Sequence, residues 1–337
     1  MRLEEFDYDL PPERIAQVPI EPRDAARLLV DRGSAPPEHR RVADLPELLR
    51  PGDVVVVNET KVIPARLRLR RRSGGRAEVL LLEPTDPERR CWEALVRPAR
   101  RLKAGEVLVA DDGRDVLAVG SRTAAGDTFQ IRLVDGTDAL ELLEDVGEMP
   151  LPPYITARLE RPDRYQTVYA REPGSAAAPT AGLHLTRELL ERIRAAGASV
   201  HPVELVVGLD TFRPIATEDP LAHRMHSERY RVPEATWAAC QAASRVVAVG
   251  TTSVRALESA AVTGQLSGRT ELFLHRGVEL RVVDVLLTNF HLPRTTLLML
   301  VDAFVGPRWR DLYAVALAEG YRFLSFGDAM LLDRHAR

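Results

Sequence analysis

The chain has 337 residues, of which 45% are hydrophobic and 28% are charged, and its formal net charge is −3. This composition supports a packed core, and the length allows one large domain or two of ordinary size. The small net charge argues against a protein that coats nucleic acid over its whole surface, but it permits a local basic patch. Nearly all positive charges are arginines, which suit bidentate phosphate contacts and are also frequent in proteins from GC-rich genomes.

Cys91 and Cys240 lie far apart and outside any metal-ligand spacing. This usage predicts a reducing compartment, without a disulfide framework or a metal site. The acidic start of the chain lacks the apolar core of a signal peptide, and charged residues interrupt the most apolar stretch, 282–305. We therefore expect a cytoplasmic protein that does not enter a membrane. The sequence determines no oligomeric state, and a monomer is the simplest expectation.

Strands and helices alternate along most of the chain. We expect a short helix at 13–17 and a helical turn at 45–49. Strands are expected at 28–30, 53–58, 203–207, 245–250, 282–287 and 322–326, and further helices at 233–243, 251–258, 295–304 and 309–318. This alternation predicts the α/β class. Polar residues follow four of the strands, namely Asn58, Thr251, His291 and Asp328, and ligands of α/β folds bind at that edge.

Residues 66–146 have a different sequence pattern from the rest of the chain. Short β-like runs alternate there with turn signals such as Ser73-Gly74-Gly75 and Asp112-Gly113. This spacing predicts a small all-β barrel or sandwich, inserted into a main domain of residues 1–65 and 147–337. The insert carries two basic clusters, which are Arg68, Arg70, Arg71, Arg72 and Arg76, and then Arg97, Arg100, Arg101 and Lys103. They suit a phosphate-backbone surface, although solvated strand faces would have the same composition.

A loop followed by a helix stands in the middle of the sequence, at residues 178–186. Pro179 and Gly182 break regular structure, and Thr186 occupies the N-cap position of a helix that ends near Gly197. His184 therefore lies at a helix N-terminus, which suits an anionic or polarised ligand, and a histidine there can move a proton near neutral pH. The alternative is a histidine that only bonds to its neighbours.

Two further loops have polar clusters. The strand expected at 245–250 leads through Gly250 into Thr251, Thr252 and a helix, which is an anion-binding arrangement but neither a Walker loop nor a dinucleotide fingerprint. Simple N-capping by Thr251 or Thr252 is the alternative. Residues 223–228 contain two histidines three positions apart without a third ligand, so they predict acid–base chemistry or an ordinary polar loop, not a metal site.

Several ordered blocks of the chain resemble one family nearly from end to end. They read FDYDLP (6–11), VIPAR (62–66), GEMPLPPYI (147–155), APTAGLH (178–184), HRMHSE (223–228), VGTTSVR (249–255), LTNFHLP (287–293) and GDAML (327–331). The family is that of the S-adenosylmethionine:tRNA ribosyltransferase-isomerases of queuosine biosynthesis. The resemblance implies a distorted α/β barrel with an inserted small β-barrel.

The resemblance also implies a reaction. The ribosyl part of S-adenosylmethionine would be transferred to the aminomethyl group of a deazaguanine base in tRNA, giving epoxyqueuosine and releasing adenine and methionine. Candidate catalytic residues are His184, Thr180 and His226. Candidate contacts to S-adenosylmethionine are Thr251, Thr252, Arg255, Asn289, His291 and Asp328. Candidate contacts to tRNA are Lys61, Arg66, Arg97, Arg100, Arg101, Lys103 and Arg224. No metal is implied.

The chain departs from the family pattern at a few positions. Asn58-Glu59-Thr60-Lys61 stands where the family usually has Asn-Asp-Thr-Arg, and Leu185 stands where it has Phe. Val206 and Asp210 replace a usual His and Gly. These changes leave open whether the acceptor differs or activity is lost. Two alternatives therefore remain, a paralogue that uses S-adenosylmethionine on a non-tRNA acceptor and a catalytically silent RNA-binding protein.

Overall fold

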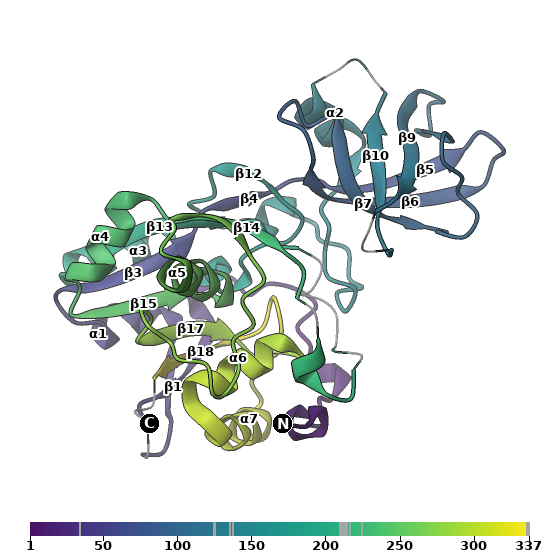
Figure 1. Ribbon diagram of the computed structural model, residues 1–337. Helices are drawn as coiled ribbons and strands as arrows, with labels where there is room; N and C mark the ends of the chain where they lie inside the picture. Colours follow the sequence, from purple (N-terminus) through teal and green to yellow (C-terminus); the bar gives the residue numbers. More distant parts are fainter. Residues whose placement is uncertain are drawn as a thin grey trace. The chain divides into compact units, whose positions relative to one another are not determined.

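The structure, a computed structural model, describes residues 1–33, 35–123, 126–134, 136, 138–208, 215, 217–223 and 225–334. The chain forms two compact units (Figure 1). The larger comprises Met1–Thr60, Pro153–Arg171 and Pro179–Arg337, and the smaller comprises Lys61–Pro152 and Glu172–Ala178. The insert expected at 66–146 lies within the smaller unit, which also takes residues 172–178 from later in the chain.

The larger unit is built on a mixed sheet of nine strands. In spatial order these are β16 (Ser267–Thr270), β14 (Glu228–Arg231), β13 (Ser199–Leu205), β3 (Asp53–Asn58), β15 (Arg245–Val249), β17 (Val285–Asn289), β18 (Ala329–Asp333), β1 (Arg27–Asp31) and β2 (Glu38–Arg41). The four strands β13, β3, β15 and β17 run parallel to one another. Consecutive valines fill β3 because both faces of this central strand are covered.

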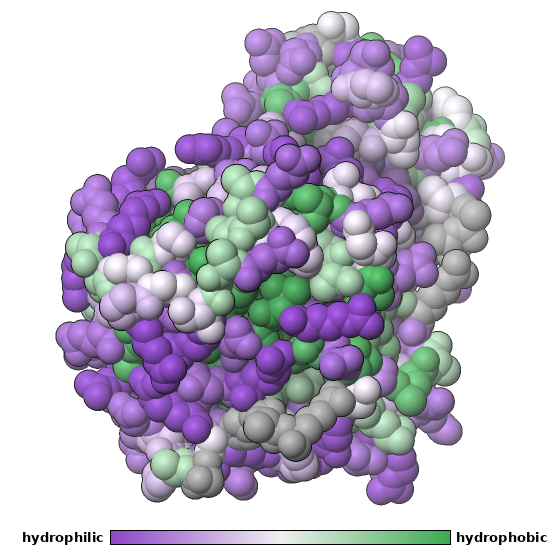
Figure 2. Space-filling view, turned by 60° about the vertical axis from the view of Figure 1, so that its left-hand side comes forward, coloured by the Kyte–Doolittle hydropathy of each residue, from purple (hydrophilic) through white to green (hydrophobic). Residues whose placement is uncertain are grey.

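Helices cover the sheet on both faces. On one face, alternate residues of the central strands pack against α1 (Leu45–Leu48) and α3 (Arg187–Ala195). The helices α4 (Glu234–Ala242) and α5 (Thr251–Thr263) pack against β13 and β3, α6 (Thr296–Val305) against β18, and α7 (Trp309–Ala318) against β1. The α/β class is confirmed. In the view of Figure 2 the surface is mainly hydrophilic, and apolar side chains show through near the middle of the larger unit.

The smaller unit is a closed β-barrel. Its strands β5 (Arg66–Arg71), β6 (Arg76–Pro84), β7 (Cys91–Arg97), β10 (Phe129–Leu133), β9 (Asp115–Arg122) and β8 (Val107–Val109) pair in that order, and β8 pairs back onto β5. Alternate residues of each strand fill the interior around the buried Trp92. The inserted β-barrel is therefore confirmed. The helix α2 (Ala139–Val146), which Asp138 caps, was not expected from the sequence.

Two short strands complete the smaller unit. β11 (Gly147–Glu148) extends the barrel sheet at β5, and β12 (Glu172–Ser175) pairs with β4 (Thr60–Val62). Through β12 the chain returns to the smaller unit after residues 153–171 have already joined the larger one.

Two expectations about local structure were wrong. Residues 322–326 form no strand, apart from an isolated bridge between Phe323 and Ile15, and the final strand is β18 instead. Asp328 therefore precedes a strand. Because β18 is antiparallel to β17, with Asn289 opposite Ala329, Asp328 still lies at the same edge of the sheet. The expected helix at 13–17 is a short 3-10 turn, Pro12–Arg14.

Every helix in the described ranges is too short or too polar to span a lipid bilayer.

Candidate functional site

The candidate site lies where β15 and β17 end and β18 begins. A 3-10 turn, η6 (Thr180–His184), packs against β17 at this edge. The turn is followed at once by α3, and Thr186 caps that helix by accepting a hydrogen bond from the Leu189 N–H at 3.0 Å. The N-cap expected at Thr186 is confirmed. Thr180 and His184 are thus held by a rigid turn between the sheet and a capped helix.

Asn289 joins Thr180 to His184. The Thr180 Oγ1 donates to Asn289 Oδ1 at 3.0 Å, and Asn289 Nδ2 lies 3.1 Å from His184 Nε2 and 3.3 Å from the Asp328 carbonyl oxygen. Because an amide nitrogen only donates, this arrangement makes His184 Nε2 an acceptor. The proton of the neutral imidazole then resides on Nδ1.

His184 is buried among positive charges. Burial lowers the pKa of His184 to about 4, and the charges of Arg322, Arg23 and Arg164 act in the same direction. A hydrogen bond to the backbone of Arg23 opposes them. The imidazole is therefore neutral at pH 7, which is the form that accepts a proton. It also lines a narrow cleft together with Arg23, Arg164 and Ser325.

The first turn of α5 adds a set of hydrogen-bond donors. Its N-cap is Gly250, with a φ of +86° that favours glycine, and no side chain caps the helix. The expected alternative of capping by Thr251 or Thr252 is therefore wrong. Within the described part of the chain, Thr252 Oγ1 and Arg255 Nη2 are buried and have no hydrogen-bond partner. An uncapped helix start with two unused donors suits an anionic group.

Arg255 is otherwise fixed by the protein. Its Nη1 pairs with the buried Glu228, and its Nε donates to the Leu272 carbonyl oxygen at 3.3 Å. Glu228 also accepts from the Gly208 N–H at 2.8 Å. The ion pair leaves one guanidinium nitrogen for a ligand and holds it in a set direction.

The η6 turn and the start of α5 are in contact. A methyl group built on Gly250 would lie 3.7 Å from the Ala181 Cβ. On its other side, the turn packs against Tyr169, because a methyl group on Gly182 would lie only 2.0 Å from the tyrosine hydroxyl. The hydroxyls of Tyr169 and Thr167 are buried without a hydrogen-bond partner among the described residues. No sequence pattern pointed to these two residues, because hydroxyl side chains in a connecting segment are common.

Other predicted site residues have structural contacts. Both carboxylate oxygens of Asp328 accept from backbone N–H groups, those of Arg27 at 3.0 Å and Arg322 at 2.8 Å. His291 bonds through Nε2 to Thr288 Oγ1 at 2.9 Å, a contact separate from the His184–Asn289 network, and burial lowers its pKa to about 3. His226 is half-buried, two residues before β14.

The predicted tRNA contacts lie mostly on the smaller unit and differ in their surroundings. The side chains of Lys61, Arg97, Arg100, Arg101 and Lys103 are exposed, whereas Arg66 is half-buried and donates to the Leu151 carbonyl oxygen at 2.9 Å. In the first basic cluster, Arg68, Arg70, Arg71 and Arg72 pair with Glu148, Asp111, Glu106 and Asp115. Four members of the first cluster are therefore paired with carboxylates, whereas the second cluster has no such ion pair among the described residues.

The positions that depart from the family pattern are only partly described. Leu185 is buried in the core beside α3, and Val206 is buried just after β13. Glu59 is buried at the end of β3, and Lys61 is exposed. Asp210 and Arg224 lie outside the described residues. Across the residues that are described, no three His, Cys, Asp or Glu side chains are placed to hold a metal ion.

Comparison with known proteins places this geometry in a family. A family model described as queuosine biosynthesis protein matches residues 3–332. The S-adenosylmethionine:tRNA ribosyltransferase-isomerase of Symbiobacterium thermophilum is 53% identical over 98% of this chain and 100% of its own length. That of Thermus thermophilus is 52% identical, over 98% of this chain and 99% of its own.

A solved structure gives the same assignment. The S-adenosylmethionine tRNA ribosyltransferase of Thermotoga maritima is 38% identical, covers 97% of this chain and 99% of its own, and superposes with a TM-score of 0.55. These relatives are enzymes of one class, transferases that act with S-adenosylmethionine on tRNA. The chain belongs to the queuosine biosynthesis protein family.

Proposed function

We propose that this chain is an S-adenosylmethionine:tRNA ribosyltransferase-isomerase. It transfers and isomerises the ribosyl moiety of S-adenosylmethionine onto the 7-aminomethyl-7-deazaguanine base in tRNA, and it releases adenine and methionine. The observation that carries the proposal is the 53% identity to a relative of that name over 98% of the chain. A tRNA substrate is consistent with the cytoplasmic location that the sequence predicts.

The reaction sets three demands on the protein. A base must remove a proton from the ribose carbon next to the sulfonium, so that the resulting ylide expels adenine. An acid must protonate the departing adenine, and the tRNA amine must be neutral to attack. The carboxylate of the methionine part needs a fixed partner while the sulfur leaves and the epoxide closes.

His184 is the proposed base. Burial keeps its imidazole neutral at pH 7, with a pKa of about 4. Because Asn289 Nδ2 donates to His184 Nε2, this nitrogen accepts the ribose proton only after it has exchanged the amide contact for the substrate. Thr180 acts through Asn289, because its hydroxyl bonds to the amide oxygen and orients the amide toward His184. Asp328 supports the same amide through its carbonyl oxygen. His226 is the proposed acid, since it lies half-buried in the segment that ends in the Arg255 partner Glu228.

The start of α5 is the proposed clamp for the methionine carboxylate. The backbone N–H groups of Thr251 and Thr252 have no side-chain cap, and Thr252 Oγ1 and Arg255 Nη2 have no hydrogen-bond partner in the described ranges. Charge-assisted hydrogen bonds of this kind are about twice as strong as neutral ones. On the smaller unit, Lys61, Arg97, Arg100, Arg101 and Lys103 are the proposed contacts to tRNA phosphates, because their charged ends are exposed.

The test is adenine release from S-adenosylmethionine, measured with and without tRNA that carries the aminomethyl-deazaguanine base. We expect release only with the modified tRNA. No release, with S-adenosylmethionine still bound, would overturn the proposal and indicate another acceptor.

We expect His184→Ala to lower this turnover by about 10²- to 10⁴-fold, the usual contribution of a general base, while S-adenosylmethionine still binds. Single-turnover adenine release and equilibrium dialysis of S-adenosylmethionine separate the two effects. Full turnover in the alanine variant would remove His184 from the mechanism.

A further inference from the structure

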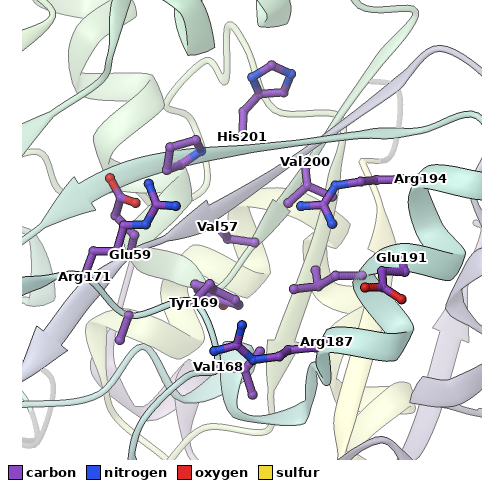
Figure 3. A pocket seen from close by; sticks show the side chains of 13 residues that line it. Val57, Glu59, Val168, Tyr169, Arg171, Arg187, Glu191, Arg194, Val200 and His201 are labelled. Carbon is purple, nitrogen blue, oxygen red and sulfur yellow. The ribbon is translucent and has the colours of Figure 1, made fainter.

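A second basic surface lies on the larger unit, and none of its arginines has been assigned a role above. It is a hollow of about 420 Å³ beside α3, shown in Figure 3. Its charged lining consists of Glu59, Arg171, Arg187, Glu191, Arg194 and His201. In Figure 3, Arg187 and Arg194 extend from α3 toward the middle of the hollow, and Arg171 lies on the opposite wall.

The three arginines of the hollow are not neutralised within the protein. Over the ranges that the structure describes, Arg171, Arg187 and Arg194 have no carboxylate within ion-pair distance, whereas four arginines of the first barrel cluster each have one. The arginines also outnumber the two carboxylates, Glu59 and Glu191, that share the lining. Unpaired guanidinium groups converging on a hollow suit phosphate oxygens, which arginine binds in a bidentate manner.

The spacing along α3 fits an extended anion better than a small one. Arg187 and Arg194 are seven residues apart, so they lie on one helix face about 10 Å from each other along the axis. Arg171 comes from a different segment, at the end of the connection that precedes β12. Three cations on two walls are suited to successive phosphates of a nucleic-acid strand.

The hollow borders the candidate catalytic turn. Tyr169 lines it, and the hydroxyl of the same tyrosine packs on Gly182 in the η6 turn. Thr180 and His184 lie at the two ends of that turn. A strand held in the hollow would therefore be separated from the turn by the side chain of Tyr169.

We propose that the hollow formed by Arg171, Arg187 and Arg194 binds phosphates of the tRNA substrate. This inference rests on the proposed function, because it assigns a contact surface for the same acceptor. It gives the larger unit an RNA contact of its own, in addition to the exposed cluster of the β-barrel.

The test uses the double variant Arg187→Gln/Arg194→Gln of the full chain, with Arg192→Gln as the matched control. Arg192 is exposed on the same helix but does not line the hollow, and glutamine is a good helix former. The probe is an unmodified tRNA transcript, titrated at several salt concentrations. We expect the double variant to bind about tenfold more weakly and its salt slope to fall by about 1 for each arginine removed.

Two further measurements define the outcome. Glu191→Gln removes a repelling carboxylate from the hollow, so it should bind the transcript more tightly than the unaltered protein. In the adenine-release assay, the double variant should raise the KM for modified tRNA and leave kcat and S-adenosylmethionine binding unchanged.

Failure of the inference can be told apart from failure of the proposed function. The inference is overturned if the double variant binds the transcript as tightly as Arg192→Gln, or if the unaltered protein binds none. The proposed function is overturned if the unaltered protein binds tRNA but releases no adenine with the modified base. Thermal unfolding of each variant checks that lost binding does not reflect lost folding.

Discussion

His184 and His291 are both buried histidines, yet their contacts differ. His184 bonds to Asn289 in a network that reaches the η6 turn, whereas His291 bonds to Thr288. Burial lowers the pKa of both, to about 4 and about 3. Two histidines near strand ends therefore belong to separate hydrogen-bond networks. What sets His184 apart is its place at a narrow cleft beside three arginines.

The two histidines should make folding sensitive to mild acid. Each binds a proton in the unfolded chain near pH 6.5 but not in the native state until pH 4 or below. Unfolded chains thus carry more protons between pH 6.5 and 4, so stability is full above this window and falls as the pH decreases through it. Lowering the pH from 7.5 to 5 should cost about 2 kcal/mol for each histidine.

Urea unfolding at the two pH values measures this loss. His184→Gln should remove about half of it, because His291 remains. An unchanged pH dependence in that variant would show that His184 is protonated equally in both states.

Gly182 is fixed by Tyr169. A methyl group at Gly182 would overlap the tyrosine hydroxyl, so Gly182→Ala should displace the η6 turn and cost about 1–3 kcal/mol of stability, with a loss of turnover. Tyr169→Phe removes the overlapping oxygen and should restore part of both. Thermal unfolding and adenine release of the two single variants and the double variant test the coupling. Additive effects would mean that the two residues act independently.

Among the elements, α5 is the helix whose start serves the site. Its two ends are glycines with positive φ, Gly250 at +86° and Gly264 at +70°. Only the first lies next to other residues of the site, since its built methyl group approaches Thr252 and Ala181, whereas that of Gly264 meets nothing within 4 Å. Backbone strain can therefore be introduced at the site and away from it, and it is greater at Gly250 (ψ 152°, a region almost restricted to glycine) than at Gly264 (ψ 9°, left-handed helical).

Gly264→Ala should destabilise the protein by about 1–2 kcal/mol and Gly250→Ala by up to about 3 kcal/mol, because alanine is strained at positive φ and most strained outside the left-handed helical region. Only Gly250→Ala should raise the KM for S-adenosylmethionine, since it moves the uncapped N–H groups of α5. Equal KM values in the two variants would contradict the proposed carboxylate clamp.

At the scale of the whole molecule, charge is distributed unevenly. In the barrel, four arginines of the first basic cluster pair with carboxylates, whereas the second cluster is exposed without such pairs among the described residues. In the larger unit, the arginines that line the hollow beside α3 are not paired with carboxylates in the described ranges. A net charge of −3 conceals this distribution. Exposed ion pairs contribute little to stability, at most about 1 kcal/mol each, but a paired arginine is less available to a phosphate.

The two barrel clusters should therefore respond differently to charge removal. The triple variant Arg97→Gln/Arg100→Gln/Arg101→Gln should weaken tRNA binding at least about tenfold. It should also flatten the salt dependence, because fewer counterions are released on binding when fewer phosphates are contacted. Arg70→Gln/Arg72→Gln, the paired control, should change binding much less. Filter binding of tRNA at several salt concentrations measures both. Equal losses would show that the ion pairs open when RNA binds.

Much of the fold was predictable because hydrophobic periodicity and turn-forming residues are local features of the sequence. The runs that form β1, β3, β15 and the barrel strands were all recognised, and α7 has the expected bounds. β18 was missed because the apolar run before it, with Phe323 and Phe326, resembles a strand but packs in the aromatic core. Hydrophobicity alone does not distinguish the two environments.

The candidate site was predictable in its loops but not in its contacts. Residues 178–186 and 249–255 were identified from loop–helix patterns, and the structure joins them. Which residue bonds to which depends on strand register, so the roles of Asp328 and His291 could not be read from spacing. The sequence also does not show which arginines form ion pairs, because the carboxylate partners lie elsewhere in the chain.

The order of strands has a consequence for synthesis on the ribosome. β1, near the N-terminus, pairs with β18 at the far end of the chain, and the Arg27 N–H bonds to Asp328. Between them the chain supplies almost every other element, so the first strand emerges long before its partner. Until residues 329–333 leave the exit tunnel, β1 and β17 each present an unpaired edge to the cell. The nascent protein must therefore remain soluble, or be shielded by a chaperone, while all the elements between β1 and β18 are synthesised.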